Sequence, residues 1–403
     1  MEYGRYSVEE EAAASYTLPD PLLKDDSSRV TTAAEWMLFQ REKILDLFKE
    51  YEYGQILPRP DSMRFELLTW KDGALNGKAI RKEVRIHCAM NNGKSISFDL
   101  LLYVPKQKTG PVPAFLGLNF GGNHVTTLEE DVHKTGFKNP GVTSMPERGC
   151  QVHRWDFETV IDRGYASATI SYHDILPDRV NSWAESAFRL FFDADQYGTI
   201  GQTYSVIGCW AWGLSRGLDY LQSDPDIAGD RVAVHGHSRL GKTSLWAGAI
   251  DQRFKMVISN NSGCGGGALH KRKIGENLSQ HFKYHTENCG VPCWFVDKLE
   301  QFIWHEELLP LDQHELMALI APRPLAIATA TEDLDADPKG EFLACKAASE
   351  VYALFGSKGL EIEEMPAPDV NISGDISFHY RTGKHNQTPQ DWAHYLDLAD
   401  RYL

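Results

Sequence analysis

Some stretches of the chain repeat apolar residues at helical spacing and others form strand-like runs. Each change from one pattern to the other marks a new expected element. Over residues 32–52 the apolar positions recur at helical spacing, which predicts a helix. Strand-like stretches follow at 65–69 and 82–87, so a helix leads into antiparallel strands. Two further strand-like runs, 95–104 and 112–120, flank a turn rich in Pro, Lys and Gly, and this arrangement predicts a β-hairpin entering a sheet.

The second half of the chain alternates strand-like segments with helix-like ones. The pattern predicts strands at 165–172, 231–234, 256–259 and 324–330, and helices at 205–222 and 389–403. Strands that alternate with helices indicate a mainly parallel sheet with helices on both faces, because each crossover connection lays its helix against the sheet. The sequence therefore predicts an α/β fold, and it shows no internal repeat or low-complexity tract.

The N-terminal stretch differs from the rest of the chain in composition. Residues 1–30 are polar and rich in Pro, Asp and Ser, which predicts an arm that wraps the protein or stays mobile and carries no chemistry. We expect residues 31–403 to form a single catalytic domain. The first residues have neither the basic start nor the apolar segment of a signal peptide, so either the protein stays inside the cell or the chain begins after cleavage.

Composition and charge exclude some partners. The chain has 403 residues, of which 42% are hydrophobic and 24% charged, and no apolar run is long enough to cross a membrane. A formal net charge of −15 repels phosphate backbones, so nucleic-acid binding is not expected. Aromatic residues make up 11% of the chain, which suits a sugar-binding cleft but is also close to what a large core uses.

The cysteines indicate neither a dense disulfide framework nor a structural zinc site. There are seven, an odd number, and they form no paired C-x-x-C units. Cys289 and Cys293 are too isolated from other ligands for a metal. Most of the seven are expected to be small buried hydrophobic residues, and whether any two form a disulfide stays open.

The stretch from Val234 to Thr243, VHGHSRLGKT, carries the main chemical signal. It places Ser238 directly after a strand-like run and between two glycines, Gly236 and Gly241, as in the nucleophile elbow of α/β-hydrolases. A serine on a sharp strand-to-helix turn needs small neighbours, and the following helix offers backbone N–H groups to an oxyanion. The second glycine comes one position later than in G-x-S-x-G, so an ordinary turn with a helix-capping serine is the alternative.

A serine nucleophile needs a histidine and an acid, which follow it in that fold in the order Ser, acid, His. His385 lies in a polar loop before the final helix and is the expected base, with His379 as the fallback. The expected acid is Asp333, which closely follows the strand predicted at 324–330. Glu332, Asp335 and Asp337 lie near enough to be confused with it, and the whole acidic stretch could merely cap a loop.

A Gly-Gly pair follows the strand predicted at 112–120. Gly121 and Gly122 stand more than a hundred residues before the serine, where α/β-hydrolases keep a loop that supplies oxyanion-hole donors. Tight turns use glycine pairs for other reasons as well, so both interpretations remain open.

With these residues in view, the chain resembles the glucuronoyl esterases of carbohydrate esterase family 15, especially their bacterial branch. The resemblance rests on five blocks, which are LNFGGNH (118–124), GHSRLGK (236–242), NSGCGG (261–266), LIAPRP (319–324) and GKH (383–385). It implies a three-layer αβα sandwich of the α/β-hydrolase type with a mixed, mainly parallel central sheet. It also implies cleavage of esters between lignin alcohols and the (4-O-methyl)-glucuronic acid side groups of xylan.

The resemblance assigns roles to several residues. Ser238 matches the nucleophile and His385 the base, while Arg239 matches the arginine that stabilises the oxyanion. A fixed cation suits that role, because the tetrahedral intermediate carries a charge that the ester lacks. Lys242 matches the lysine that hydrogen-bonds sugar hydroxyls, and Glu276 aligns with the sugar-binding glutamate.

The chain departs from the family pattern in two places. Many members place the acid after the strand that follows the elbow, but residues 258–263 contain no carboxylate. Other bacterial members use an aspartate after a later strand, which is Asp333 here. Members often carry a tryptophan two residues beyond that aspartate, whereas this chain has Asp335, an anion that would repel a free uronate product.

The sequence therefore predicts a cofactor-free, metal-independent serine carboxylester hydrolase acting on glucuronoyl esters through an acyl-enzyme. An acetyl xylan or other carbohydrate esterase is the alternative within the class, and an inactive carbohydrate-binding homologue is the alternative outside it. No H-E-x-x-H or comparable ligand cluster supports a metal-dependent hydrolase. The expected partner is a small-molecule or polysaccharide ester and the protein is expected to be a monomer, secreted or periplasmic if it was trimmed and cytoplasmic if it is full length.

Overall fold

The computed structural model describes residues 4, 6–136, 146–179, 182–283 and 294–403. The strands are β1 (Ser62–Ala74), β2 (Ala79–Ala89), β3 (Ser95–Pro105), β4 (Val112–Asn119), β5 (Ala166–Ser171), β6 (Ile227–His237), β7 (Met256–Asn260), β8 (Leu325–Ala330), β9 (Asn371–Ile372) and β10 (Ile376–Arg381). The α-helices are α1 (Ala33–Glu35), α2 (Arg41–Tyr51), α3 (Phe157–Asp162), α4 (Tyr172–Ile175), α5 (Val206–Leu221), α6 (Arg239–Ile250), α7 (Leu278–Lys283), α8 (Gln313–Ala318), α9 (Pro338–Ala353) and α10 (Pro389–Tyr402).

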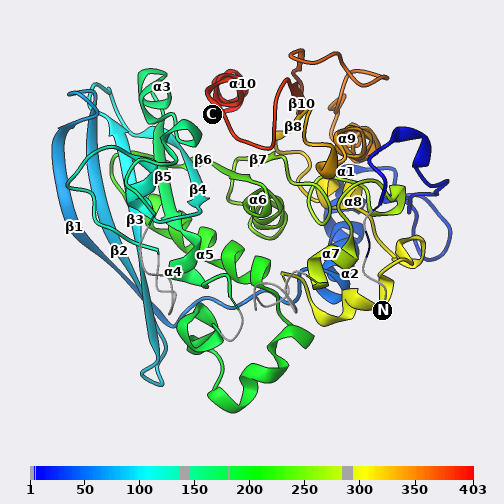
Figure 1. The fold of residues 1–403 in the computed structure, drawn as a ribbon, viewed down its shortest axis with the longest axis horizontal. Coiled ribbons are helices and arrows are strands. Elements are labelled where there is room, and N and C mark those ends of the chain that lie inside the picture. Colours follow the sequence, from blue (N-terminus) through cyan, green and yellow to red (C-terminus); the bar gives the residue numbers. More distant parts are fainter. Residues whose placement is uncertain (1–3, 5, 137–145, 180–181, 284–293) are drawn as a thin grey trace.

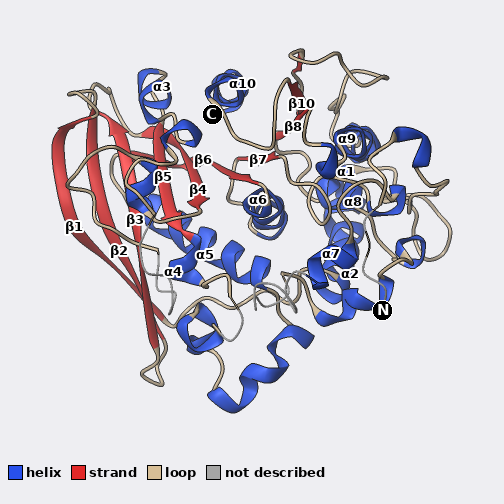
Figure 2. Ribbon diagram, viewed as in Figure 1, coloured by secondary structure: helices blue, strands red, loops and turns tan. Residues whose placement is uncertain are grey.

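The ten strands form one mixed sheet in the order β1-β2-β3-β5-β4-β6-β7-β8-β10-β9. The inner neighbours from β5 to β10 pair in parallel, and antiparallel strands lie on both sides of them. Figure 1 shows α3 and α10 above the sheet and α5 and α6 below it, and Figure 2 shows the strands side by side between these layers. The predicted α/β-hydrolase fold with a mixed, mainly parallel central sheet is confirmed.

The core is divided by the sheet, because successive side chains of a strand point to opposite faces. On β6, Val232 and Val234 belong to the large apolar cluster on the side of α5 and α6. Ala233 belongs to the smaller cluster on the other side, where α10 contributes Trp392. A strand buried on both faces is apolar at most positions, which explains the apolar run at 232–234 on β6.

The predicted hairpin between 95–104 and 112–120 is wrong, although both strands exist. β5 lies between β3 and β4, antiparallel to β3 and parallel to β4. The connection at 106–111 is six residues long, and such a segment spans up to about 20 Å, enough to pass over one strand at roughly 5 Å per spacing. Strand neighbours are therefore chosen by packing, not by closeness in the sequence.

The other predicted elements are confirmed, with shifted ends. The helix expected at 32–52 is α1 and α2 joined by a π-helical turn at Trp36–Gln40. The helix expected at 205–222 is α5, which begins where the Ser205 hydroxyl accepts a hydrogen bond from the backbone N–H of Gly208. Every residue of α5 is buried, because the sheet and other helices enclose it.

The N-terminal arm packs against the segment that precedes α7. The backbone N–H of Gly275 donates to the carbonyl of Ser7, and that of Ala14 donates to the carbonyl of Arg272, both at 3.0 Å. The Tyr6 hydroxyl donates to Glu306 at 2.7 Å. The boundary between arm and catalytic domain at residue 30 stays a prediction.

Two further expectations concern membranes and cysteines. Within the described ranges, no helix combines the length and the apolar character needed to cross a bilayer. Cys88, Cys150, Cys209, Cys264 and Cys345 are free thiols, and all but Cys150 are buried. Cys289 and Cys293 lie outside the described residues.

Candidate active site

Ser238 stands on a strained turn between β6 and α6. Its backbone has φ 59° and ψ −130°, a region that side chains with a Cβ rarely adopt and that persists only where the surroundings enforce it. The backbone N–H of Ser238 donates to the carbonyl of Asn260 at 2.8 Å, which ties the turn to the end of β7. The strain thus holds the hydroxyl at the carboxyl edge of the sheet.

Both glycines of the elbow are required by close contacts. A Cβ on Gly236 would lie 1.9 Å from the carbonyl oxygen of Leu240, so the turn could not close. A Cβ on Gly241 would lie 3.0 Å from the Ser259 hydroxyl and 3.1 Å from the Asn260 carbonyl, because α6 packs closely on β7 there. The displaced second glycine therefore serves the contact between helix and strand.

Replacement of Gly236 by alanine is expected to lower the free energy of unfolding by about 3 kcal/mol, since backbone atoms must move to accept the new Cβ. Gly198→Ala is the matched control, because no atom lies within 4 Å of a Cβ at that exposed position. Urea unfolding of both variants measures the effect. Equal stability of the two variants would contradict this account of the elbow.

His385 and Asp333 form a hydrogen-bonded pair beside the elbow. The Nδ1 atom of His385 lies 2.7 Å from Oδ2 of Asp333, whose side chain is only 8% exposed. A carboxylate at Nδ1 keeps the proton there and leaves Nε2 as the basic nitrogen. The His385 ring also packs on His237, the residue before Ser238, with ring centres 4.6 Å apart.

The serine–histidine contact is open in this structure. Within the described part of the chain, neither the Ser238 hydroxyl nor Nε2 of His385 has a hydrogen-bond partner. Such contacts often tighten only when substrate is bound, so the arrangement is consistent with a relay between these two groups.

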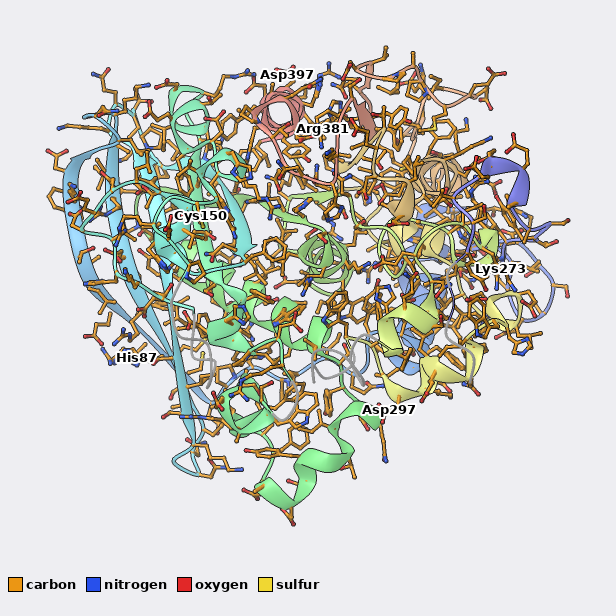
Figure 3. The ribbon with its side chains drawn as sticks, viewed as in Figure 1. His87, Cys150, Lys273, Asp297, Arg381 and Asp397 are labelled. Carbon is orange, nitrogen blue, oxygen red and sulfur yellow. The ribbon has the colours of Figure 1, made fainter. Side chains whose placement is uncertain are left out.

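Arg381, labelled in Figure 3, holds the loop that carries His385. Its Nη2 atom donates at 2.9 Å to the carbonyls of both Lys384 and Asn386, the two neighbours of His385. Its Nε atom lies 3.2 Å from Asp391, on the first turn of α10. One buried guanidinium therefore fixes the loop on both sides of the imidazole.

The alternative acids lie in other surroundings. Glu332 is exposed, and its backbone N–H donates to Gly383. The backbone carbonyl of Asp335 accepts a hydrogen bond from the N–H of Glu276 at 2.9 Å. Asp337 caps α9 and forms an ion pair with Arg272 at 2.9 Å. Asp333 is the acid that the structure places against His385.

The alternative base also lies apart from the elbow. His379 is buried in β10, where its ring lies 3.9 Å from that of His394 and its Nε2 atom 3.3 Å from Asp391. These contacts place it against α10.

Arg239 is held by a carboxylate that sequence reasoning missed. Its Nη1 atom donates to Oδ2 of Asp178 at 2.6 Å, and Nε1 of Trp294 donates to the other oxygen of Asp178 at 3.0 Å. The guanidinium lies over the Trp294 ring at 4.5 Å. Asp178 follows β5 at the same edge of the sheet as Ser238, and this placement is the only sequence signal that could have found it.

Lys242 and Glu276 form an ion pair of 3.0 Å behind the elbow. The Lys242 ammonium also donates to the carbonyls of Ser262 at 2.8 Å and Cys264 at 2.5 Å, so its three N–H groups are all used. Burial opposes ionisation of Glu276, but the charge of Lys242 outweighs it and lowers the Glu276 pKa to about 2. The Glu276 side chain is 33% exposed, so a ligand can reach it more readily than Lys242.

The Gly-Gly loop borders the elbow through Phe120. The Phe120 ring lies 6.2 Å from that of His237 and 6.0 Å from the Arg239 guanidinium. The backbone N–H of Gly122 donates to the Asn119 side chain at 2.7 Å, so this donor is already engaged.

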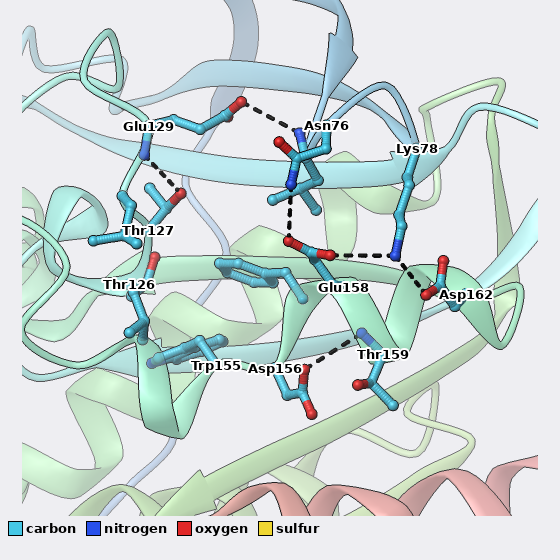
Figure 4. Close-up of a pocket in the computed structure, with 14 residues that line it drawn as sticks. Asn76, Lys78, Thr126, Thr127, Glu129, Trp155, Asp156, Glu158, Thr159 and Asp162 are labelled. Atoms are coloured by element: carbon cyan, nitrogen blue, oxygen red, sulfur yellow. Dashed lines mark hydrogen bonds and ion pairs between the residues drawn. The ribbon is translucent and has the colours of Figure 1, made fainter.

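Two further observations delimit the site. The described residues contain no group of three or more His, Cys, Asp or Glu side chains arranged to hold a metal ion. A groove of about 700 Å³ lies between the β1–β2 turn and α3 (Figure 4), but none of the residues discussed above lines it. Polar groups at its rim bind one another, as Lys78 does with Glu158 and Asp162.

One family model and several known proteins are similar to this chain. Residues 157–356 match the family model described as "Glucuronyl esterase, fungi". A carbohydrate esterase from an unknown prokaryotic organism is 41% identical over 409 residues, which cover 99% of this chain and 92% of the relative.

Two solved structures superpose over nearly the whole chain. One is a promiscuous esterase of carbohydrate esterase family 15 from a marine bacterial metagenome, 40% identical, with a TM-score of 0.87 and coverage of 99% of this chain and 100% of that one. The other is a glucuronoyl esterase from Solibacter usitatus, 36% identical, with a TM-score of 0.90 and coverage of 97% and 99%. The chain belongs to carbohydrate esterase family 15, the family of the glucuronoyl esterases.

Proposed function

We propose that this protein is a serine carboxylester hydrolase that cleaves esters of (4-O-methyl)-glucuronic acid, as in lignin–glucuronoxylan linkages, through an acyl-enzyme. The observation that carries the proposal is the imidazole–carboxylate pair of His385 and Asp333 packed against the turn that bears Ser238. The glucuronoyl esterase activity named for the Solibacter relative supports the choice of acyl group.

The mechanism uses only groups of this chain. Nε2 of His385 takes the proton as the Ser238 hydroxyl attacks the ester carbonyl, while Asp333 stabilises the imidazolium that forms. Collapse of the tetrahedral intermediate expels the alcohol, which receives that proton, and leaves the uronoyl group on Ser238. His385 then deprotonates a water that attacks the acyl carbon. When this second tetrahedral intermediate collapses, the bond to the Ser238 oxygen breaks, the imidazolium returns its proton to that oxygen, and the uronic acid is released.

We assign to Arg239 the positive charge that stabilises the oxyanion. The ester is neutral and the tetrahedral intermediate is an anion, so a fixed guanidinium stabilises the transition state more than the ground state. Asp178 and Trp294 hold the guanidinium before the reaction begins, so little reorganisation is needed. The backbone N–H groups at the start of α6 add to the same effect.

Replacement of Asp178 by asparagine is expected to lower kcat about tenfold with little change in KM, because it loosens Arg239 without removing it, and loss of an entire oxyanion donor costs roughly 10²- to 10³-fold. Steady-state kinetics on a glucuronate ester measures the change. Asp131→Asn is the control, since Asp131 also pairs with an arginine, Arg81, but outside the site. A change in KM with an unchanged kcat would contradict the role of Asp178.

On the sugar side, we propose that Glu276 accepts hydrogen bonds from substrate hydroxyls. Its pKa of about 2 keeps it ionised at neutral pH, and an ionised carboxylate is a strong acceptor. Lys242, predicted from the resemblance to contact the sugar directly, would have to exchange one of its three present acceptors to do so. The negative charge of Glu276 also disfavours rebinding of a free uronate product.

A broader carbohydrate esterase is the second candidate, favoured by the 40% identical structure described as a promiscuous esterase. Side-by-side assays distinguish the glucuronoyl esterase from the broader carbohydrate esterase. The substrates are methyl glucuronate, acetylated xylan and p-nitrophenyl acetate. We expect the highest kcat/KM on the glucuronate ester. A large preference for the acetyl substrates would replace the proposed substrate with an acetyl ester.

The alternative of an inactive carbohydrate-binding homologue is tested by covalent chemistry. A fluorophosphonate probe should label Ser238, because an activated serine attacks phosphorus as it attacks an ester carbonyl. Absence of both labelling and ester turnover in the folded protein would favour the inactive homologue.

A further inference from the structure

One oxygen of Asp333 accepts two hydrogen bonds. Oδ2 lies 2.7 Å from Nδ1 of His385 and 2.7 Å from Nδ2 of Asn261. Asn261 follows β7 and opens the block NSGCGG (261–266), which contributed to the resemblance without a role for Asn261. The side chain at the end of β7 thus contacts the acid that emerges after β8.

The backbone fixes the Asn261 amide in this place. Asn261 has φ 48°, a left-handed conformation that asparagine tolerates better than most residues. Its N–H donates to the carbonyl of Ala328 at 2.6 Å, and the residue is 2% exposed. The preceding carbonyl, of Asn260, accepts from the N–H of Ser238 at 2.8 Å. One turn therefore contacts both the nucleophile and the acid.

We propose that Asn261 is a positioning residue of the relay, whose amide fixes the orientation of the Asp333 carboxylate toward His385. The proposal rests on the proposed function, with Asp333 as the acid. A carboxylate with one partner can turn about its last torsion, which is broad, whereas two donors on the same oxygen define its direction. The amide also offsets part of the cost of burying the charge, since hydrogen bonds to ions are the stronger ones.

Several titratable and charged groups surround the pair of Asp333 and His385. The titratable and charged groups near the pair are Glu341 of α9, His237 of β6, Glu276, Arg381 of β10 and Arg154. Burial raises the pKa of Glu341 to about 8, and burial lowers the pKa of His237 well below its usual value. Burial therefore favours the neutral form of both groups.

The first test is Asn261→Gly, which removes the amide and keeps the left-handed backbone without strain. We expect kcat/KM on methyl glucuronate to fall on the order of 10- to 100-fold, as for other partners that orient a functional side chain. Asn76→Gly is the matched control: Asn76 has φ 57° and donates to the carboxylate of Glu158 in the remote groove of Figure 4. We expect it to retain wild-type activity.

The second test is Asn261→Asp, which preserves shape and adds a carboxylate next to Asp333. Two adjacent carboxylates and an imidazole titrate as one cluster. The added negative charge makes this cluster hold its last proton more tightly than the wild-type pair of Asp333 and His385 does. The midpoint of the acid limb of kcat/KM against pH should therefore move to higher pH. Asn76→Asp should leave the midpoint unchanged, and so should any variant that acts only by lowering the amount of folded protein.

The outcomes separate this proposal from the proposed function. If Asn261→Gly retains activity within twofold of the wild type, or if Asn261→Asp keeps the wild-type midpoint, while Asp333→Asn is impaired, Asn261 is not a positioning residue and the proposed function stands. If Asp333→Asn is as active as the wild type, the acid is assigned wrongly and the inference about Asn261 fails with it. Should the glycine variant fail to fold, the midpoint of the isosteric aspartate variant decides.

Discussion

Replacement of Ser238 by alanine is expected to lower kcat on a glucuronate ester by roughly 10⁴-fold or more, because the acyl-enzyme can no longer form. Alanine keeps the Cβ, so the backbone strain at φ 59° and the packing of the elbow are unchanged. Substrate binding should persist, since Glu276 and Arg239 are untouched. The residual rate would come from Arg239 and binding alone.

The measurement is kcat and KM by direct detection of released methanol, together with fluorophosphonate labelling. Ser223→Ala is the control, since the Ser223 hydroxyl is exposed and donates to the carbonyl of Tyr220 away from the elbow. Near wild-type turnover by Ser238→Ala would refute nucleophilic catalysis by this serine and require direct attack by water or another nucleophile.

Replacement of Asp333 by asparagine is expected to lower kcat on the order of 10³- to 10⁴-fold. The size of the amide is nearly that of the carboxylate, but the amide cannot stabilise the imidazolium and can donate to Nδ1 of His385, which selects the wrong tautomer. The structure adds a second reason, because the Asn261 amide that now donates to Oδ2 would face another amide at 2.7 Å. The effect should appear in kcat more than in KM.

Glu332→Gln is the control for this variant, because Glu332 is the adjacent carboxylate and is exposed. We expect it to retain wild-type kinetics. A large loss in Glu332→Gln together with full retention in Asp333→Asn would move the acid by one position. Wild-type activity in both variants would remove this acidic stretch from the mechanism.

Much of the fold could be predicted from local pattern. The helices at 32–52 and 205–222 and the strands around Ser238 are long and strongly periodic, and burial on one or both faces dictates that periodicity. The hairpin expected before residue 120 failed because pairing between strands is a long-range choice. A short connection shows only that two strands follow one another.

Part of the candidate site could also be predicted from local pattern. Ser238 and Asp333 each follow a predicted strand, and the carboxyl ends of neighbouring parallel strands meet at one edge of a sheet. His385 lies in the polar loop before the predicted final helix. Their order along the chain then assigned them the roles of nucleophile, acid and base. Asp178 and Asn261 also follow strands, but a carboxylate that holds an arginine and an amide that holds an acid have no local signature.

By itself, the sequence determined the elements, the α/β class, the strained serine turn and the order of nucleophile, acid and base, because backbone sterics and side-chain burial act over a few neighbouring residues. Only the tertiary structure decided that β5 separates β3 from β4, that Asp333 is the acid hydrogen-bonded to His385, and that Asn261 contacts Asp333 and Asp178 contacts Arg239. These contacts join residues 52 to 72 positions apart, and their geometry exists only once the sheet has brought its strand ends together.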